Sequence, residues 1–178
     1  MKNPSDVIGA MLQWSKDFIE KPNWVFGDLP VCPFAKAARL KKTIRFEVMP
    51  FDLDDPLEHG GAIMSLALSL LRDRTLETLF VIHPHANQVE ARELEAFVAR
   101  LNERLAASDV TGDLEAFEAH PDSEFSVGGV YTRRAPYPSF QMLRRSLLKS
   151  ASDSLLGSAY YDQFTPDMLR AVGMPRSG

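Results

Sequence analysis

The sequence lacks the features that mark several large protein classes. It holds a single cysteine in 178 residues, which excludes an intramolecular disulfide. Its 20 basic and 24 acidic side chains give a formal net charge of −4, so it has no basic excess that would predict a nucleic-acid partner. No apolar run approaches the roughly 18 residues that a membrane span needs. The longest, residues 62–71, is interrupted by Ser65 and Ser69, so no membrane partner is predicted.

The N-terminal segment also lacks the signals of export. Acidic and polar residues are scattered through residues 1–20, and no unbroken apolar stretch of a signal peptide is present there. Together with the lone cysteine, this predicts a cytoplasmic protein. The glycine pairs at 60–61 and 128–129 are isolated, which is typical of turns and not of a nucleotide-binding loop.

What the chain does have is an ordinary globular composition, with 45% hydrophobic and 25% charged residues. Its length predicts a single domain over residues 1–178 with a real hydrophobic core. Alternation over residues 44–49 and a continuous apolar run over 79–82 predict strands. Apolar spacings of three and four from Leu94 to Leu105 predict a helix. The same reasoning predicts an N-terminal helix over 4–20, a short helix over 33–40, a helix ending near 72, a third strand over 114–119, a last long helix opened by Pro136 and Pro138, and a loosely packed tail from about 157.

This order of elements predicts the α/β class. Strands that alternate with helices favour a small, mostly parallel sheet packed by helices. The third strand could instead pair in the antiparallel direction. The alternative architecture is a ferredoxin-like α+β sandwich.

Two histidines follow predicted strands in the same way. His83 and His120 each stand at a strand end, with a proline directly behind. The carboxyl ends of parallel strands share one edge of a sheet, where ligand sites collect, so we expect these two histidines to meet there. His85, two residues after His83, faces the same side. The competing interpretation is that each histidine only caps backbone groups.

Cys32 precedes Pro33 and a run of helix-forming residues. Proline favours the first helical turn, so the pattern predicts Cys32 at a helix N-cap. The helix dipole and the neighbouring cations, from Lys36 to Lys42, would stabilise a thiolate there. The alternative is a buried cysteine that acts as a small hydrophobic residue.

An arginine pair, Arg133 and Arg134, precedes the last predicted helix, with Tyr137 close behind. Arginines beside a helix N-terminus can hold a carboxylate or phosphate, so this group is a candidate binding site for an anionic small-molecule substrate. Solvated surface arginines are the alternative. The acidic residues of 52–58 fit no calcium-loop spacing, and no cation site is predicted there.

Four ordered motifs resemble a known family. They are VCPFAKA from Val31, HPH from His83, HPDSEF from His120 and YTRRAPYP from Tyr131. Together they resemble the bacterial family filed as domain of unknown function 1415. That family usually has Asn, Ser and His where this chain has Arg133, Ala135 and Gln141, so the last predicted helix is not expected to donate ligands. The resemblance supports the choice of site residues and implies no reaction.

Three functions fit these residues. The leading hypothesis is a metal-dependent enzyme that acts on a small molecule, oxidative with iron or copper and hydrolytic with zinc. Its metal ligands would come from Cys32, His83, His85 and His120. The second is a metal-free enzyme in which Cys32 is the nucleophile, His83 or His120 the base, and Arg134 positions an anionic substrate. The third is a non-catalytic module that binds a small anion or a protein.

Overall fold

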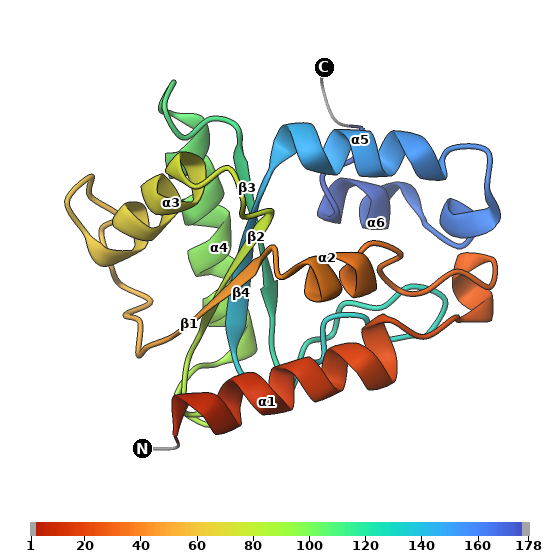
Figure 1. Ribbon diagram of the computed structural model, residues 1–178, viewed down its shortest axis with the longest axis horizontal. Coiled ribbons are helices and arrows are strands. Elements are labelled where there is room, and N and C mark those ends of the chain that lie inside the picture. The colour runs from red at the N-terminus through yellow and green to blue at the C-terminus, as the bar shows by residue number, and fades with distance from the viewer. Residues whose placement is uncertain (1–2, 176–178) are drawn as a thin grey trace.

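Figure 1 shows the computed structural model, which describes residues 3–175, as a sheet with helices on both faces. The strands are β1 (Ile44–Val48), β2 (Thr78–Ile82), β3 (Leu114–Ala119) and β4 (Ser139–Arg144). The helices are α1 (Pro4–Trp14), α2 (Ala35–Lys41), α3 (Ala62–Arg72), α4 (Ala91–Ala106), α5 (Arg145–Leu155) and α6 (Pro166–Ala171). A π-helical turn, η1 (Ser15–Ile19), extends α1, and 3-10 turns form η2 (Trp24–Phe26) and η3 (Ala159–Tyr161).

The sheet is mixed, in the order β1-β2-β4-β3. β1 and β2 are parallel, whereas β4 is antiparallel to both of its neighbours. The α/β class is therefore confirmed, although the pairing is less parallel than the sequence favoured. The ferredoxin-like alternative is wrong, because that fold runs β-α-β-β-α-β and this chain runs β-α-β-α-β-β from β1 to β4.

β4 runs opposite to both of its neighbours, and β1 is parallel to β2, so β1, β2 and β3 all run in the same direction. β1, β2 and β3 therefore end at one edge of the sheet, where β4 begins. We call this the carboxyl edge. The prediction that the ends of β2 and β3 share an edge is confirmed, even though β4 separates the two strands.

β4 occupies residues that the sequence assigned to the last helix. The helix begins only at Arg145. Phe140, Leu143 and Leu147 have helical spacing, but Phe140 and Met142 also alternate with Gln141 at the period of a strand. Hydrogen bonding to β2 on one side and β3 on the other decides between the two patterns.

The two faces of the sheet are covered differently. On the first face, α3 and α4 pack over the main core, which includes Leu79, Val81, Phe140 and Met142. On the second face, α1 contributes Val7 and Met11 to a smaller cluster around Ile82. A third cluster joins η1 and η2 to Tyr160, Phe164 and Met168 of the C-terminal segment. Within residues 3–175, no helix is long and apolar enough to cross a membrane.

Candidate functional site

His83 lies at the carboxyl edge, on the first face of the sheet. Its backbone N–H donates to the carbonyl of Pro138 at 2.9 Å, which continues the pairing of β2 with β4. The side chain is 5% exposed. Its ring meets Phe51 edge to face, with centroids 5.2 Å apart, and lies 5.9 Å from the ring of His85. The sequence prediction that His83 and His85 lie together is confirmed.

The ring of His83 is oriented by its own chain. Nδ1 lies 3.1 Å from the carbonyl oxygen of His85 and 3.3 Å from the backbone nitrogen of the same residue. We assign the tautomer in which Nδ1–H donates to the nearer carbonyl, so that Nε2 carries a free lone pair. The structure gives Nε2 no hydrogen-bond partner within residues 3–175. Burial lowers the pKa of His83, which favours the neutral imidazole that a metal ligand or a general base needs.

His120 stands at the same edge, but both of its ring nitrogens are used by the backbone. Nε2–H donates to the carbonyl of Val89 at 2.8 Å, and Nδ1 accepts from the N–H of Asp122 at 3.0 Å. The ring is 3% exposed. The arrangement therefore fits the capping interpretation, in which His120 joins the loop after β2 to the end of β3.

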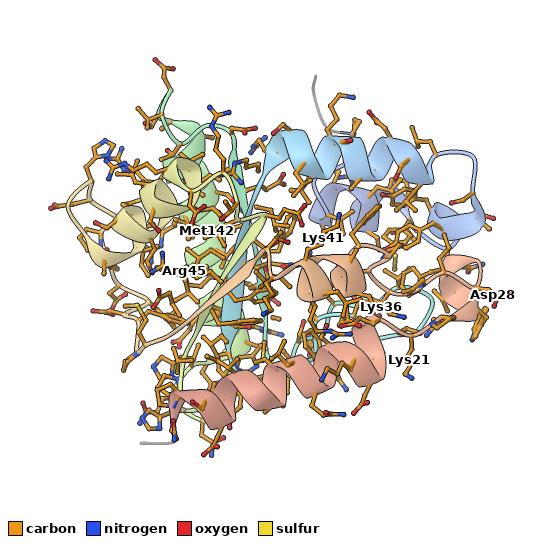
Figure 2. The ribbon with its side chains drawn as sticks, viewed as in Figure 1. Lys21, Asp28, Lys36, Lys41, Arg45 and Met142 are labelled. Carbon is orange, nitrogen blue, oxygen red and sulfur yellow. The ribbon has the colours of Figure 1, made fainter. Side chains whose placement is uncertain are left out.

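Cys32 lies before α2 in different surroundings. The helix begins at Ala35, and Phe34, not Cys32, is its N-cap. Burial raises the pKa of the Cys32 thiol; hydrogen bonds from the backbone of Phe34 and Ala35 oppose the rise, and the Glu20 charge adds to it. Lys36 and Lys41 on α2 are exposed (Figure 2). The predicted N-cap position of Cys32 is therefore wrong, and desolvation acts against a thiolate more strongly than the helix N–H groups act for it.

Cys32 is also placed away from the histidines. Its N–H donates to the carbonyl of Ile19, at the end of η1. Met11, in the same continuous helix, packs near Ile82 at the carboxyl edge. Eight helical residues separate Met11 from Ile19, which is roughly 12 Å at about 1.5 Å per residue. Residues 3–175 contain no group of three or more His, Cys, Asp or Glu that could hold a metal ion, so the four predicted ligands do not form one cluster.

The two arginines have different roles in the structure. Arg133 pairs with Glu118, donates to the carbonyl of Ala171 at 2.9 Å and covers the ring of Phe125 at 4.2 Å. Those contacts occupy its guanidinium and tie α6 to β3. Tyr137 is 6% exposed and belongs to the cluster under α1, which leaves little of its surface for a substrate at the edge.

Arg134, in contrast, is exposed and preorganised. Its Nε donates to the carbonyl of Ser123 at 2.9 Å, and its guanidinium carbon lies 3.5 Å from the ring centroid of Tyr131. Ser123 follows His120 in the loop that leaves the carboxyl edge. Arg134 is therefore the member of the predicted anion site that remains available.

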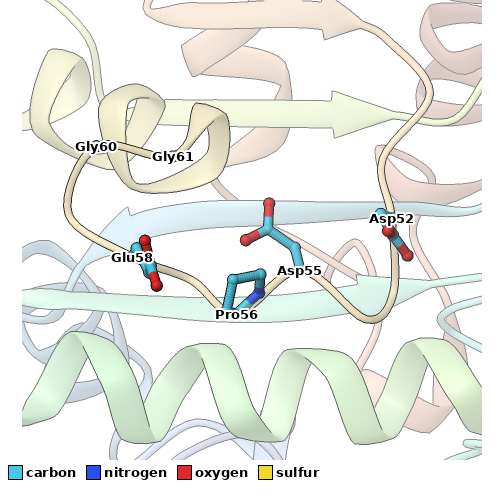
Figure 3. Close-up of a pocket in the computed structure, with 6 residues that line it drawn as sticks. All are labelled: Asp52, Asp55, Pro56, Glu58, Gly60 and Gly61. Atoms are coloured by element: carbon cyan, nitrogen blue, oxygen red, sulfur yellow. The ribbon is translucent and has the colours of Figure 1, made fainter.

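Two hollows open among the loops that follow β1 and β2. One of about 340 Å³ is lined by Pro84, His85, Ala86, Asn87 and Gln88. The other, of about 530 Å³, lies in the acidic loop and is lined by Asp52, Asp55, Pro56, Glu58, Gly60 and Gly61 (Figure 3). In the second hollow, Asp52 and Asp55 accept backbone N–H groups of Asp54 and Leu57 at 2.9 and 2.7 Å. Those carboxylates therefore cap backbone groups of the loop.

Sequence reasoning missed two polar residues of β4. Ser139 and Gln141 lie on the second face of the sheet, between residues of β2 and β3. The signal was available, because both alternate with the buried Phe140 and Met142. The helical interpretation of this segment concealed it.

A comparison with protein families gives one finding. The family described as "Protein of unknown function (DUF1415)" matches residues 8–163. The match includes every candidate site residue above. No curated protein and no solved structure matches the chain.

Proposed function

Because the chain belongs to the DUF1415 family, whose description assigns no activity, we propose a function from its carboxyl edge: it is a cytoplasmic, metal-dependent enzyme acting on a small molecule at His83 and His85. The observation that carries the proposal is the state of His83. Its Nδ1 is held by the backbone of His85, 3.1 Å from the carbonyl oxygen and 3.3 Å from the nitrogen, and within residues 3–175 its Nε2 has no hydrogen-bond partner. Metal-binding histidines characteristically donate their other ring N–H to a carbonyl in this way.

The neighbourhood supports a small-molecule substrate. His85 lines the hollow of about 340 Å³, within the usual range for ligand pockets of about 300–1,000 Å³. Arg134 would hold an anionic group of the substrate, since its guanidinium is exposed and fixed over Tyr131. Imidazole ligands suit iron, copper and zinc. With iron or copper the bound metal would supply oxidative chemistry, and with zinc it would supply hydrolytic chemistry.

The first experiment is elemental analysis of protein purified without a metal-affinity tag. We expect near-stoichiometric metal in the wild type and its loss in His83→Gln and His85→Gln. His120→Gln is the matched control and should keep the metal, since both nitrogens of His120 already bond to the backbone. Protein that stays empty after reconstitution with iron, copper and zinc would overturn the proposal, as would equal metal in all variants.

A second candidate is a metal-free enzyme in which Nε2 of His83 is the general base. The observation that favours it is the lack of a third ligand around the two histidines within residues 3–175. Burial raises the pKa of the Cys32 thiol, which favours His83 over Cys32 as the centre of this version. If metal-depleted protein retains a turnover found by substrate screening and His83→Gln abolishes it, the metal-free form is the correct one. Turnover that survives His83→Gln would exclude this base.

A further inference from the structure

The two outer strands of the sheet, β3 and β1, differ in how their outward backbone groups are covered. On β3, the side-chain amide of Asn102 accepts from the N–H of Ala116 at 2.7 Å and donates to its carbonyl at 2.9 Å. At the end of that strand, the N–H of His120 donates to the carbonyl of Arg133 at 2.9 Å. These contacts occupy the positions at which a further strand would pair, which is how native proteins protect the edge of a sheet.

The outward backbone groups of β1 have no such cover. Its odd-numbered residues face β2, as shown by Met49, whose N–H donates to the carbonyl of Ile82 at 3.0 Å. The N–H and C=O groups of Ile44, Phe46 and Val48 therefore point away from β2, and we call them the open side of β1. Within residues 3–175, no hydrogen bond reaches them. Figure 1 shows β1 in front of the other strands, with no helix crossing it.

The side chains of β1 are also incompletely covered. All of them are half-buried, whereas β2 is buried at every position except Phe80. Arg45 and Glu47 form an ion pair on the first face, where Arg45 also donates to Oγ of Ser69, on α3, at 3.3 Å. Their side chains are 41% and 32% exposed. Both charges are therefore accessible beside the open side of the strand.

The sequence of β1, Ile-Arg-Phe-Glu-Val, is self-complementary in the antiparallel direction. When two copies are aligned about Phe46, Arg45 of each copy lies opposite Glu47 of the other, and Ile44 lies opposite Val48. The two adjacent registers that use the same backbone groups place Arg45 opposite Arg45 or Glu47 opposite Glu47. A parallel, in-register pairing also brings like charges together. Opposite charges directly across a strand pair are stabilising and like charges are destabilising, so the charges select one register.

We propose that the open side of β1 binds the same strand of a second copy, which gives a two-fold symmetric dimer with a continuous sheet. Phe46 would exchange two backbone hydrogen bonds with its counterpart, and Ile44 would exchange two with Val48 of the other copy. Arg45 and Glu47 then occupy the non-hydrogen-bonded pairs, in which side chains approach most closely. The interface is isologous, so pairing in one dimer uses the open side of both copies and stops there.

This interface goes beyond the proposed enzyme centre and does not rest on it. The hydrogen bonds that hold His83 come from Pro138 and His85, and β1 supplies none of them. Loss of metal in the histidine variants and loss of association in β1 variants are therefore separate results.

The test is sedimentation equilibrium of the full chain over a range of concentrations. We expect wild-type protein to reach twice the chain mass of 19.9 kDa. Arg45→Glu and Glu47→Arg each place like charges opposite one another at both symmetric positions, and each should raise the dimer Kd at least about tenfold. The matched controls are Arg92→Glu and Glu95→Arg, which make the same charge changes at exposed positions of α4 and should dimerise as the wild type does.

Two further measurements address the register and the backbone bonds. A mixture of Arg45→Glu and Glu47→Arg proteins again has opposite charges across the interface, so native mass spectrometry should show the heterodimer in excess over either homodimer. Val48→Pro removes an outward N–H but no hydrogen bond to β2, a change that an edge strand tolerates. This variant should be monomeric at concentrations at which wild-type protein is a dimer.

Three results would overturn the proposal. They are wild-type protein that stays monomeric at submillimolar concentration, charge variants that dimerise as tightly as wild-type protein, and a mixture of the two charge variants that forms no heterodimer. Thermal unfolding of each variant separates lost association from lost folding. If Val48→Pro does not fold, the charge variants decide the outcome, because their substitutions change partly exposed side chains.

Discussion

Replacing Ser139 with alanine should stabilise the protein, which is unusual for a change in a fully buried position. The substitution removes one oxygen atom that has no hydrogen-bond partner. A buried, unsatisfied hydroxyl costs about 1–3 kcal/mol of folding free energy. The dispersion energy of that single atom is smaller, roughly 0.5–1 kcal/mol. We therefore expect the free energy of unfolding to rise by about 1 kcal/mol, and Tm by about 2–4 °C for a chain of this length.

The matched control is Thr111→Val, which removes a buried hydroxyl that does have a partner. Thr111 is 0% exposed, and its Oγ1 donates to the carbonyl of Leu105 at 2.9 Å. The near-isosteric change removes the shorter of two hydrogen bonds to that carbonyl, which also accepts from the N–H of Ser108 at 3.4 Å, and should cost about 1–2 kcal/mol. Urea denaturation and calorimetry of both variants measure whether each substitution raises or lowers the free energy of unfolding. Destabilisation by Ser139→Ala as large as that by Thr111→Val would refute the reasoning, because it would mean that the Ser139 hydroxyl is satisfied.

Three further predictions concern the ionisable residues. Arg39 holds the pKa of Glu20 below its usual value, so the stability that this pair contributes is present above about pH 4.3 and is lost as the pH falls through the folded-state pKa. The acid limb of stability against pH should be shallower in Glu20→Gln, and an unchanged limb would exclude the pair. His120→Ala should lower the free energy of unfolding by about 2–4 kcal/mol, because two buried hydrogen bonds are lost, one of them to Val89; a loss below about 0.5 kcal/mol by urea denaturation would contradict this structural role. Iodoacetamide should alkylate Cys32 at least about tenfold more slowly in native than in urea-unfolded protein, because burial raises the thiol pKa; equal rates would show a reactive thiol.

Local patterns predicted most of the elements and much less of their pairing. The strand at 114–119 has the predicted bounds, the strand predicted over 44–49 spans 44–48, and the helix marked by Leu94 to Leu105 lies within α4. Each has a clear period in its own sequence. Phe140 to Leu147 satisfies a strand period and a helix period at once, and only the neighbouring strands select between them. Such a choice is a property of tertiary structure that no local window contains.

The candidate site shows the same division between what a local sequence pattern predicts and what tertiary contacts decide. The placement of His83 and His120 at one edge follows from strand direction, which the sequence predicted. What each ring does there depends on backbone atoms distant in the chain, such as the carbonyl of Val89 that occupies His120. Cys32 was grouped with the histidines because of its residue type and its motif. Its hydrogen bond to Ile19 places it at the far end of the first helix, and no spacing in the sequence carries that information.

The insertion of β4 explains how one strand fixes His83 on the first face and buries Ser139 on the second. Its entry at the carboxyl edge brings the carbonyl of Pro138 to the N–H of His83 at 2.9 Å and fixes that histidine on the first face. One residue later, Ser139 turns its hydroxyl to the second face, where β2 and β3 supply only Ile82 and Ala119 as neighbours. A parallel strand in the same place would have ended at this edge and not begun there, so the Pro-Tyr-Pro segment could not have met His83. The antiparallel strand thus serves the two faces by consecutive residues, and Ser139 and Gln141 lie on the face opposite His83.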